Sequence, residues 1–167
     1  MGSGKSTIGK QLAERLNYYF VDLDNFIEEK TFSKINLLFR QFGEEEFRKI
    51  EKEYLLDLAV YDNMVVACGG GTITNLANEK WMNENGLTVL LDENFETIFK
   101  RLNQEKEIEK RPLLKAIAGK NFKKSLQLLF EKRANAYQNC KIKIKSEKDL
   151  TNTIEKIEEE IQRIKLK

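Results

Sequence analysis

The apolar residues of this chain follow two periods, one typical of helices and one typical of strands. Ile8, Leu12 and Leu16 recur at four-residue spacing. This spacing predicts a helix that begins at Lys5 or Ser6. Similar spacing predicts helices from about residue 25, after Gly43, over 95–102, over 122–137 and from 154 to 164. Apolar runs at 18–21, 64–67 and 87–91, and strict alternation at 141–145, predict strands. Because strands and helices alternate, we expect an α/β fold, a parallel sheet with helices on both faces.

Composition narrows the classes of function. The length indicates a single domain over 1–167. Lys and Arg (29) nearly balance Asp and Glu (27) and are mixed with them, which argues against a nucleic-acid partner. The absence of histidine excludes a histidine base and a histidine zinc site, and Cys68 and Cys140 are too few for a metal cluster. No apolar run approaches the roughly 18 residues of a membrane span, and no signal-peptide pattern is present, so we expect a cytoplasmic protein.

The segment 2–7, GSGKST, supplies most of the phosphate-binding pattern G-x-x-x-x-G-K-[ST]. Its glycines let backbone N–H groups turn toward phosphate oxygens, and the helix that follows adds its positive end. In this pattern Lys5 reaches the β- and γ-phosphates, and the Ser6 hydroxyl ligates Mg²⁺. A flexible linker is the alternative, but a helix directly after the loop favours the phosphate site. The first glycine and the strand that feeds the loop would precede Met1, so we expect residues upstream of Met1 in the natural protein.

Two carboxylates, Asp22 and Asp24, end the strand predicted at 18–21. Carboxylates two residues apart on a strand point the same way, and a cation or a proton relieves their repulsion. Mg²⁺ beside the phosphate loop fits this requirement. The alternative is that Asp24 caps the next helix. The position of the pair directly after the phosphate-loop helix favours the functional interpretation.

Arg48 lies one helical turn from both Glu44 and Glu51. Either carboxylate can hold its guanidinium group by a contact along one helix face. An arginine fixed in this way presents a fork to a carboxylate or phosphate ligand. An exposed helix salt bridge is the alternative, and the pattern alone does not decide between the two.

Three consecutive glycines, Gly69 to Gly71, follow the strand predicted at 64–67. Such a run has a large entropic cost. We therefore expect another group to come close to the backbone there. A plain tight turn is the alternative.

Arg111 and the only proline of the chain, Pro112, end a polar and charged segment at 103–110. A cation on a hinged flap can close over phosphates and stabilise charge during transfer. We therefore expect a mobile lid over about 103–115. A further candidate, Arg133, lies in the segment KRANAY.

The chain resembles the shikimate kinase family in six segments that occur in the same order: GSGKST, DLD, FGEEEFRKIE, GGGT, RPLL and KRANAY. The resemblance implies a P-loop fold like that of nucleoside monophosphate kinases, in three α/β/α layers. Its parallel sheet would have the order 2-3-1-4-5, with the first strand upstream of Met1. The implied reaction transfers the γ-phosphoryl group of ATP to the 3-hydroxyl of shikimate, giving shikimate 3-phosphate and ADP. This step belongs to the biosynthesis of chorismate and the aromatic amino acids.

The resemblance also assigns roles to residues. The ATP site would comprise Gly2, Ser3, Gly4, Lys5, Ser6, Thr7, Arg101 and Arg111. Arg101 would contact the adenine, and Arg111 would reach the phosphates from the lid. Mg²⁺ would be held by Ser6 and, through water, by Asp22. Asp24 would be the base, with Lys5 and Arg111 as further catalytic residues. Shikimate would be bound by Asp24, Arg48, Gly69, Gly70, Gly71 and Arg133, with Glu51 positioning Arg48 and a substrate-binding region over about 24–61.

The chain departs from the family pattern at two points. Cys68 stands where the family usually has threonine, and the carboxyl-terminal region has no proline near the adenine site. Two rival functions are a gluconate kinase, which shares the phosphate loop, and a catalytically weak nucleotide-binding module. The DLD, FGEEEFR and RPLL segments favour shikimate over gluconate. Lys5, Asp24 and Arg111 together argue against a weak module, and we expect a monomer.

Overall fold

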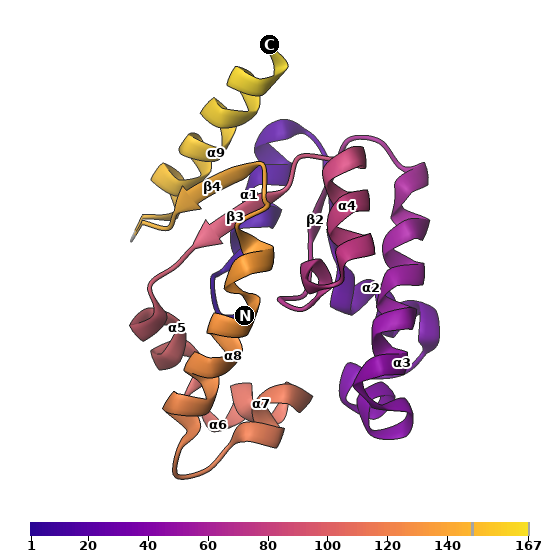
Figure 1. The fold of residues 1–167 in the computed structure, drawn as a ribbon. Coiled ribbons are helices and arrows are strands. Elements are labelled where there is room, and N and C mark those ends of the chain that lie inside the picture. The colour runs from indigo at the N-terminus through magenta and orange to yellow at the C-terminus, as the bar shows by residue number, and fades with distance from the viewer. Residues whose placement is uncertain (148, 167) are drawn as a thin grey trace.

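The computed structural model describes residues 1–147 and 149–166. The strands are β1 (Tyr19–Asp22), β2 (Met64–Ala67), β3 (Val89–Asp92) and β4 (Ile142–Lys145). The longer helices are α1 (Lys5–Leu16), α2 (Leu23–Thr31), α3 (Ile35–Asp57), α4 (Leu76–Asn85), α5 (Phe95–Leu102), α8 (Phe122–Tyr137) and α9 (Leu150–Lys165). The short elements are α6 (Glu105–Glu109), α7 (Pro112–Ile117) and the 3₁₀ turns η1 (Leu58–Val60) and η2 (Thr72–Thr74). Figure 1 shows their arrangement.

The strands form two separate parallel pairs (Figure 1). In one pair, β1 runs beside β2, with Tyr19 opposite Met64. In the other, β3 runs beside β4, with Val89 opposite Ile142. If the four strands are counted as the second to fifth of the order 2-3-1-4-5, both pairs are neighbours that this order requires. The five-stranded order itself stays a prediction.

Helices cover both faces of the β1–β2 pair. On one face, Val65 packs with Ile8 and Leu12 of α1, in an apolar cluster that also takes in β4 and α9. On the other face, Val66 packs with a cluster built from α2 and α3. Neighbouring residues of β2 therefore point into different clusters, as the two-residue period of a strand requires. This is the layered α/β arrangement expected from the sequence.

A third apolar cluster lies under the phosphate loop. Its buried members are Ile98, Leu102, Leu114, Phe122 and Leu126, from α5, α7 and α8. Leu114 has no exposed surface, although it lies inside the predicted lid. The carboxyl-terminal part of that segment is therefore anchored in the core.

Several elements agree with the sequence predictions, whereas one helix was not predicted. β2, α5 and α8 have the predicted bounds. The pattern did not predict α4, because its apolar residues are not gathered on one face: Leu76 is exposed, whereas Asn78 is buried. Its start is nevertheless marked by Asn75, whose side chain accepts hydrogen bonds from two backbone amides of the first turn. None of the helices in the described residues is long and apolar enough to span a membrane.

Candidate active site

The phosphate loop enters α1 through two glycines with positive φ. Gly2 has φ of 70°, and Gly4, the N-cap residue, has φ of 87° and ψ of 12°. This left-handed conformation strains residues that carry a Cβ, so both positions favour glycine. No side chain among the described residues caps α1. The amides of its first turn are therefore free to bind an anion at the positive end of the helix.

Lys5 and Ser6 converge on Asp22 at the end of β1. Lys5 Nζ lies 3.4 Å from Asp22 Oδ2, and the Ser6 hydroxyl donates to the same oxygen at 2.5 Å. Mg²⁺ usually keeps several waters and takes only one or two protein carboxylates, together with substrate phosphates. The described residues hold no group of three or more acidic, cysteine or histidine side chains that would bind a metal by themselves. The hydroxyl and carboxylate pair therefore fits a Mg²⁺ ion that arrives with nucleotide.

Asp22 and Asp24 do not lie side by side on one strand, which corrects the sequence interpretation. Asp22 ends β1 and is itself the N-cap of α2, since its Oδ1 accepts from the Asp24 amide at 3.2 Å. The alternative that Asp24 is the cap is therefore wrong. The chain turns from strand to helix between the two residues, so the period of a strand no longer relates their side chains.

Asp24 lies between the phosphate loop and the glycine turn. Burial raises the pKa of its carboxyl group above the usual value, and the nearby Lys5 ammonium partly opposes this shift. Its Oδ1 is 3.5 Å from the point that a Cβ on Gly69 would occupy. A carboxylate with raised pKa, close to a phosphate-binding lysine, suits the role of a base.

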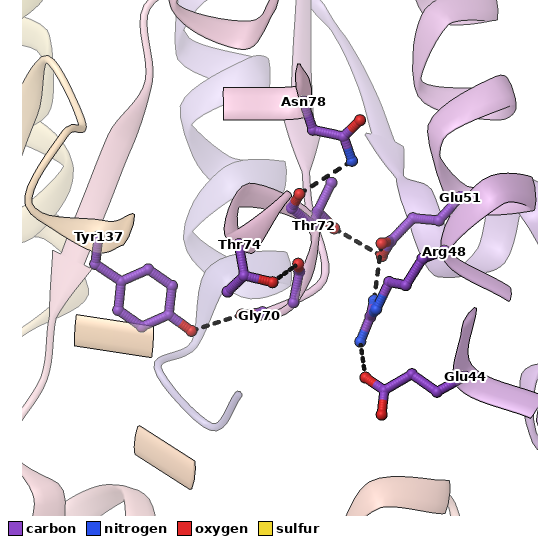
Figure 2. A network of polar contacts seen from close by, with 9 residues as sticks. Glu44, Arg48, Glu51, Gly70, Thr72, Thr74, Asn78 and Tyr137 are labelled. Atoms are coloured by element: carbon purple, nitrogen blue, oxygen red, sulfur yellow. Dashed lines mark hydrogen bonds and ion pairs between the residues drawn. The ribbon is translucent and has the colours of Figure 1, made fainter. Parts of the chain in front are cut away.

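Arg48 is held as a fork by two glutamates on its own helix (Figure 2). Its guanidinium donates to Glu51 at 2.8 Å and to Glu44 at 3.1 Å. Glu51 is only 1% exposed, which rules out an ordinary exposed salt bridge. Gly43, with φ of 78° and ψ of 177°, interrupts α3 just before this segment, so Glu44 lies at the start of a new helical stretch. The sequence prediction that these glutamates hold Arg48 is confirmed by these contacts.

The three glycines make room for the surrounding polar groups. A Cβ on Gly71 would lie 2.3 Å from a guanidinium nitrogen of Arg48. A Cβ on Gly69 would lie 3.0 Å from a carboxylate oxygen of Glu51. A Cβ on Gly70 would lie 3.2 Å from a guanidinium nitrogen of Arg133. The glycine turn is therefore a place of close approach, as predicted, and more than a plain tight turn.

Arg133 brings a second buried cation to the glycine turn from α8. It is 7% exposed, and no carboxylate of the described residues lies within ion-pair distance of it. On the same helix, the Tyr137 hydroxyl donates to the Gly70 carbonyl at 2.7 Å (Figure 2). A buried cation is costly unless it is paired. The site therefore provides an electrostatic reason to bind an anion beside Gly70.

Arg111 and Arg101 are engaged with other parts of the chain. The Arg111 guanidinium donates to the carbonyl of Glu107 at 3.1 Å and pairs with its carboxylate, inside the predicted lid. Arg101 donates to the Gly2 carbonyl at 2.8 Å and pairs with Glu93 at 3.1 Å. Arg101 thus fastens α5 to the phosphate loop. Its contact with adenine, and the reach of Arg111 to the phosphates, stay predictions.

Comparisons with known proteins agree with this geometry. A family model described as shikimate kinase matches residues 1–165. The shikimate kinase of Sulfurihydrogenibium sp. is 41% identical over 165 residues, which are 99% of this chain and 93% of that protein. The chain belongs to the shikimate kinase family. Among solved structures, shikimate kinase from Acinetobacter baumannii in complex with shikimate is similar at a TM-score of 0.89 and 32% identity, covering 100% of this chain and 91% of that one. Shikimate kinase from Aquifex aeolicus is similar at a TM-score of 0.81 and 36% identity, and the match covers 97% of this chain and 92% of that one.

Membership of the shikimate kinase family makes the chain an ATP-dependent phosphotransferase and decides against the gluconate kinase rival.

The structure shows the surroundings of Cys68, which stands where the family usually has threonine. Cys68 packs against the apolar cluster of α2 and α3. Burial raises the pKa of its thiol to about 12. The thiol is therefore protonated at neutral pH and packs as a small apolar group.

Sequence reasoning did not single out Thr72, Asn78 and Tyr137, which form hydrogen bonds at and around the glycine turn. Thr72 donates to Glu51 at 2.7 Å, and Asn78 donates to the Thr72 carbonyl at 3.0 Å. Thr72 and Tyr137 lie inside the segments GGGT and KRANAY that carry the resemblance, so their motifs offered a signal. Asn78 offered none, because its role depends on α4 packing against the glycine turn.

Proposed function

We propose that this chain transfers the γ-phosphoryl group of ATP to the 3-hydroxyl of shikimate at the site built around Asp24. The observation that carries the proposal is the position of Asp24 between Lys5 of the phosphate loop and the glycine turn. A nucleotide on the loop and an acid beside Gly69 would then meet at one carboxylate. Within the family, this reaction serves the biosynthesis of chorismate and the aromatic amino acids.

The phosphate loop would bind the nucleotide. The free amides at the start of α1 face the phosphates, and Lys5 adds a positive charge. Ser6 and Asp22 would hold Mg²⁺, which neutralises charge on the β- and γ-phosphates when it is bound. The Lys5 ammonium, which now pairs with Asp22, would interact with the charge of the γ-phosphoryl group during transfer. Phosphoryl transfer needs mainly positioning and charge neutralisation, so a site without histidine is sufficient.

The acceptor would be bound by two arginines and the glycine backbone. Arg48, fixed by Glu44 and Glu51, would bind the shikimate carboxylate as a fork. Arg133, buried without a carboxylate partner among the described residues, would bind the same group from α8. With the carboxylate held, the 3-hydroxyl would face Asp24, which accepts its proton as the γ-phosphoryl group is transferred. The pKa of Asp24, raised by burial, makes it a stronger base than an exposed carboxylate.

The segment 103–115 would act as the lid. Its Arg111 is paired with Glu107 and would have to exchange that partner for nucleotide phosphates on closure. Leu114, buried in the cluster with α5 and α8, would be the fixed end about which the segment moves. Because every element of the site comes from one chain, we expect the monomer to be active.

The test is the reaction itself. The chain is incubated with ATP, Mg²⁺ and shikimate, and the product is identified by mass spectrometry. We expect a phosphorylated acid of the mass of shikimate 3-phosphate, and no product with gluconate. Tight ATP binding without turnover on either acid would instead support a nucleotide-binding module. Asp24→Asn is the matched variant, since it keeps the shape of the side chain and removes the base.

A further inference from the structure

Thr72 joins two parts of the site that come from distant segments of the chain. Its hydroxyl donates to Glu51 Oε1 at 2.7 Å, while Glu51 Oε2 accepts from Arg48 at 2.8 Å (Figure 2). Thr72 has no exposed surface and Glu51 is 1% exposed. The two oxygens of one buried carboxylate are thus divided between the threonine and the arginine.

This division fixes the direction of the Arg48 fork. A carboxylate with one bound oxygen can rotate about its terminal torsion, which is broad. A second hydrogen bond from Thr72 restrains that rotation, and the guanidinium partner is restrained with it. Glu44 contacts the other side of the fork but is half exposed, with 51% of its side chain accessible. Glu51 therefore does most to position the Arg48 guanidinium, and Thr72 restrains Glu51.

The backbone of Thr72 belongs to the glycine turn. Its amide donates to the Gly69 carbonyl at 3.2 Å, which closes the turn. Its carbonyl accepts from Asn78 Nδ2 of α4 at 3.0 Å. Asn78 is 2% exposed, and its Oδ1 has no partner in the part of the chain that the structure describes. A buried amide oxygen without a donor costs free energy. The hydrogen bond from Asn78 to the Thr72 carbonyl offsets part of this cost and explains why a polar side chain is buried here.

We infer that Thr72 is a positioning residue for shikimate, aligning the Arg48 fork through Glu51 with the glycine turn, and that Asn78 fixes Thr72 to α4. The inference rests on the proposed function and names residues that do not themselves touch the substrate. It predicts a specific defect: loss of the Thr72 hydroxyl weakens recognition of the shikimate carboxylate and leaves ATP binding intact.

Thr72→Val removes the hydroxyl at nearly constant volume. We expect kcat/KM for shikimate to fall by about tenfold or more, the effect of losing one hydrogen bond to a buried charge, while KM for ATP stays within about twofold. Thr72→Ser keeps the hydroxyl and should stay within about threefold of the unmodified chain. The matched control is Thr153→Val in α9, a threonine equally without exposed surface and also hydrogen-bonded through its hydroxyl. It should lower the melting temperature without changing either substrate constant.

A double-mutant cycle separates positioning from a general loss of structure. If Thr72 acts through the fork, Thr72→Val should change kcat/KM for shikimate by less than about twofold in the Arg48→Ala background. A full additive effect there, or equal loss of ATP and shikimate binding in Thr72→Val alone, would overturn the inference.

If Thr72→Val does not fold, Asn78→Ala provides the test. We expect it to lower kcat/KM for shikimate by about threefold at constant KM for ATP, and an equal effect on both substrates would overturn the inference. An unmodified chain that does not phosphorylate shikimate would refute the proposed function instead, so the two failures are distinguishable.

Discussion

Replacing Arg133 by methionine should stabilise the ligand-free protein and weaken its binding of shikimate. The arginine is 7% exposed, with its guanidinium against Gly70 and Tyr137 and no carboxylate partner among the described residues. Methionine has a similar length and carries no charge. Arg133→Met therefore tests whether the fold tolerates a buried cation for the sake of a ligand.

The magnitude follows from burial and pairing. An unpaired buried ion costs several kcal/mol, and replacing buried charges by apolar groups of similar volume gains up to roughly 1–4 kcal/mol. Because the guanidinium still faces the site, we expect a gain of about 1–3 kcal/mol in the free energy of unfolding without ligand. Loss of the charged hydrogen bonds to shikimate should cost about 2–5 kcal/mol, or about thirtyfold or more in affinity.

The assay is urea unfolding with and without shikimate. Shikimate at one hundred times its dissociation constant for the unmodified chain should stabilise that chain by about 2.7 kcal/mol and, at the same concentration, the variant by less than about 1 kcal/mol. Arg15→Met is the control, because Arg15 is already paired with Glu158 at 2.7 Å on the surface, and no gain is expected there. A variant that is less stable than the unmodified chain without ligand, or that keeps its stabilisation by shikimate, would refute the reasoning.

Three further predictions address the base, the fork and the lid. Asp24→Asn should raise the free energy of unfolding near pH 7, because the pKa of Asp24 is raised by burial and its charged form is disfavoured in the fold. The advantage should shrink as pH falls through that raised pKa, where the unmodified carboxyl takes up a proton; an advantage that grows toward low pH would contradict the sign. Arg48→Ala should weaken shikimate binding by about 2–5 kcal/mol in calorimetry and leave ATP binding nearly unchanged, whereas equal losses would speak against a carboxylate fork. Amide exchange over 103–115 should slow when ADP and shikimate are added, and an unchanged rate would exclude a lid there.

The helices and strands of this protein were largely predictable because their cause is local. The four-residue spacing of Ile8, Leu12 and Leu16 produced a helix that ends at Leu16, as α1 does. The alternation at 141–145 produced β4, whose burial alternates residue by residue. α4 escaped prediction because a buried Asn78 and an exposed Leu76 reverse the expected pattern. Asn78 is buried because it contacts the glycine turn, and Leu76 lies at the surface. Both environments arise only when the chain packs.

The chemistry of the site divides in the same way. The sequence alone determined the phosphate loop, because glycines with positive φ, a lysine and a helix start are contiguous in the chain. It also indicated that Glu44 or Glu51 could contact Arg48, since helix geometry relates residues three and four apart, but not that both do so at once. Only tertiary structure decided that Arg133 is buried without a carboxylate partner among the described residues and that Thr72 holds Glu51. These facts depend on groups brought together from separate segments, and their burial sets the energies that local sequence does not encode.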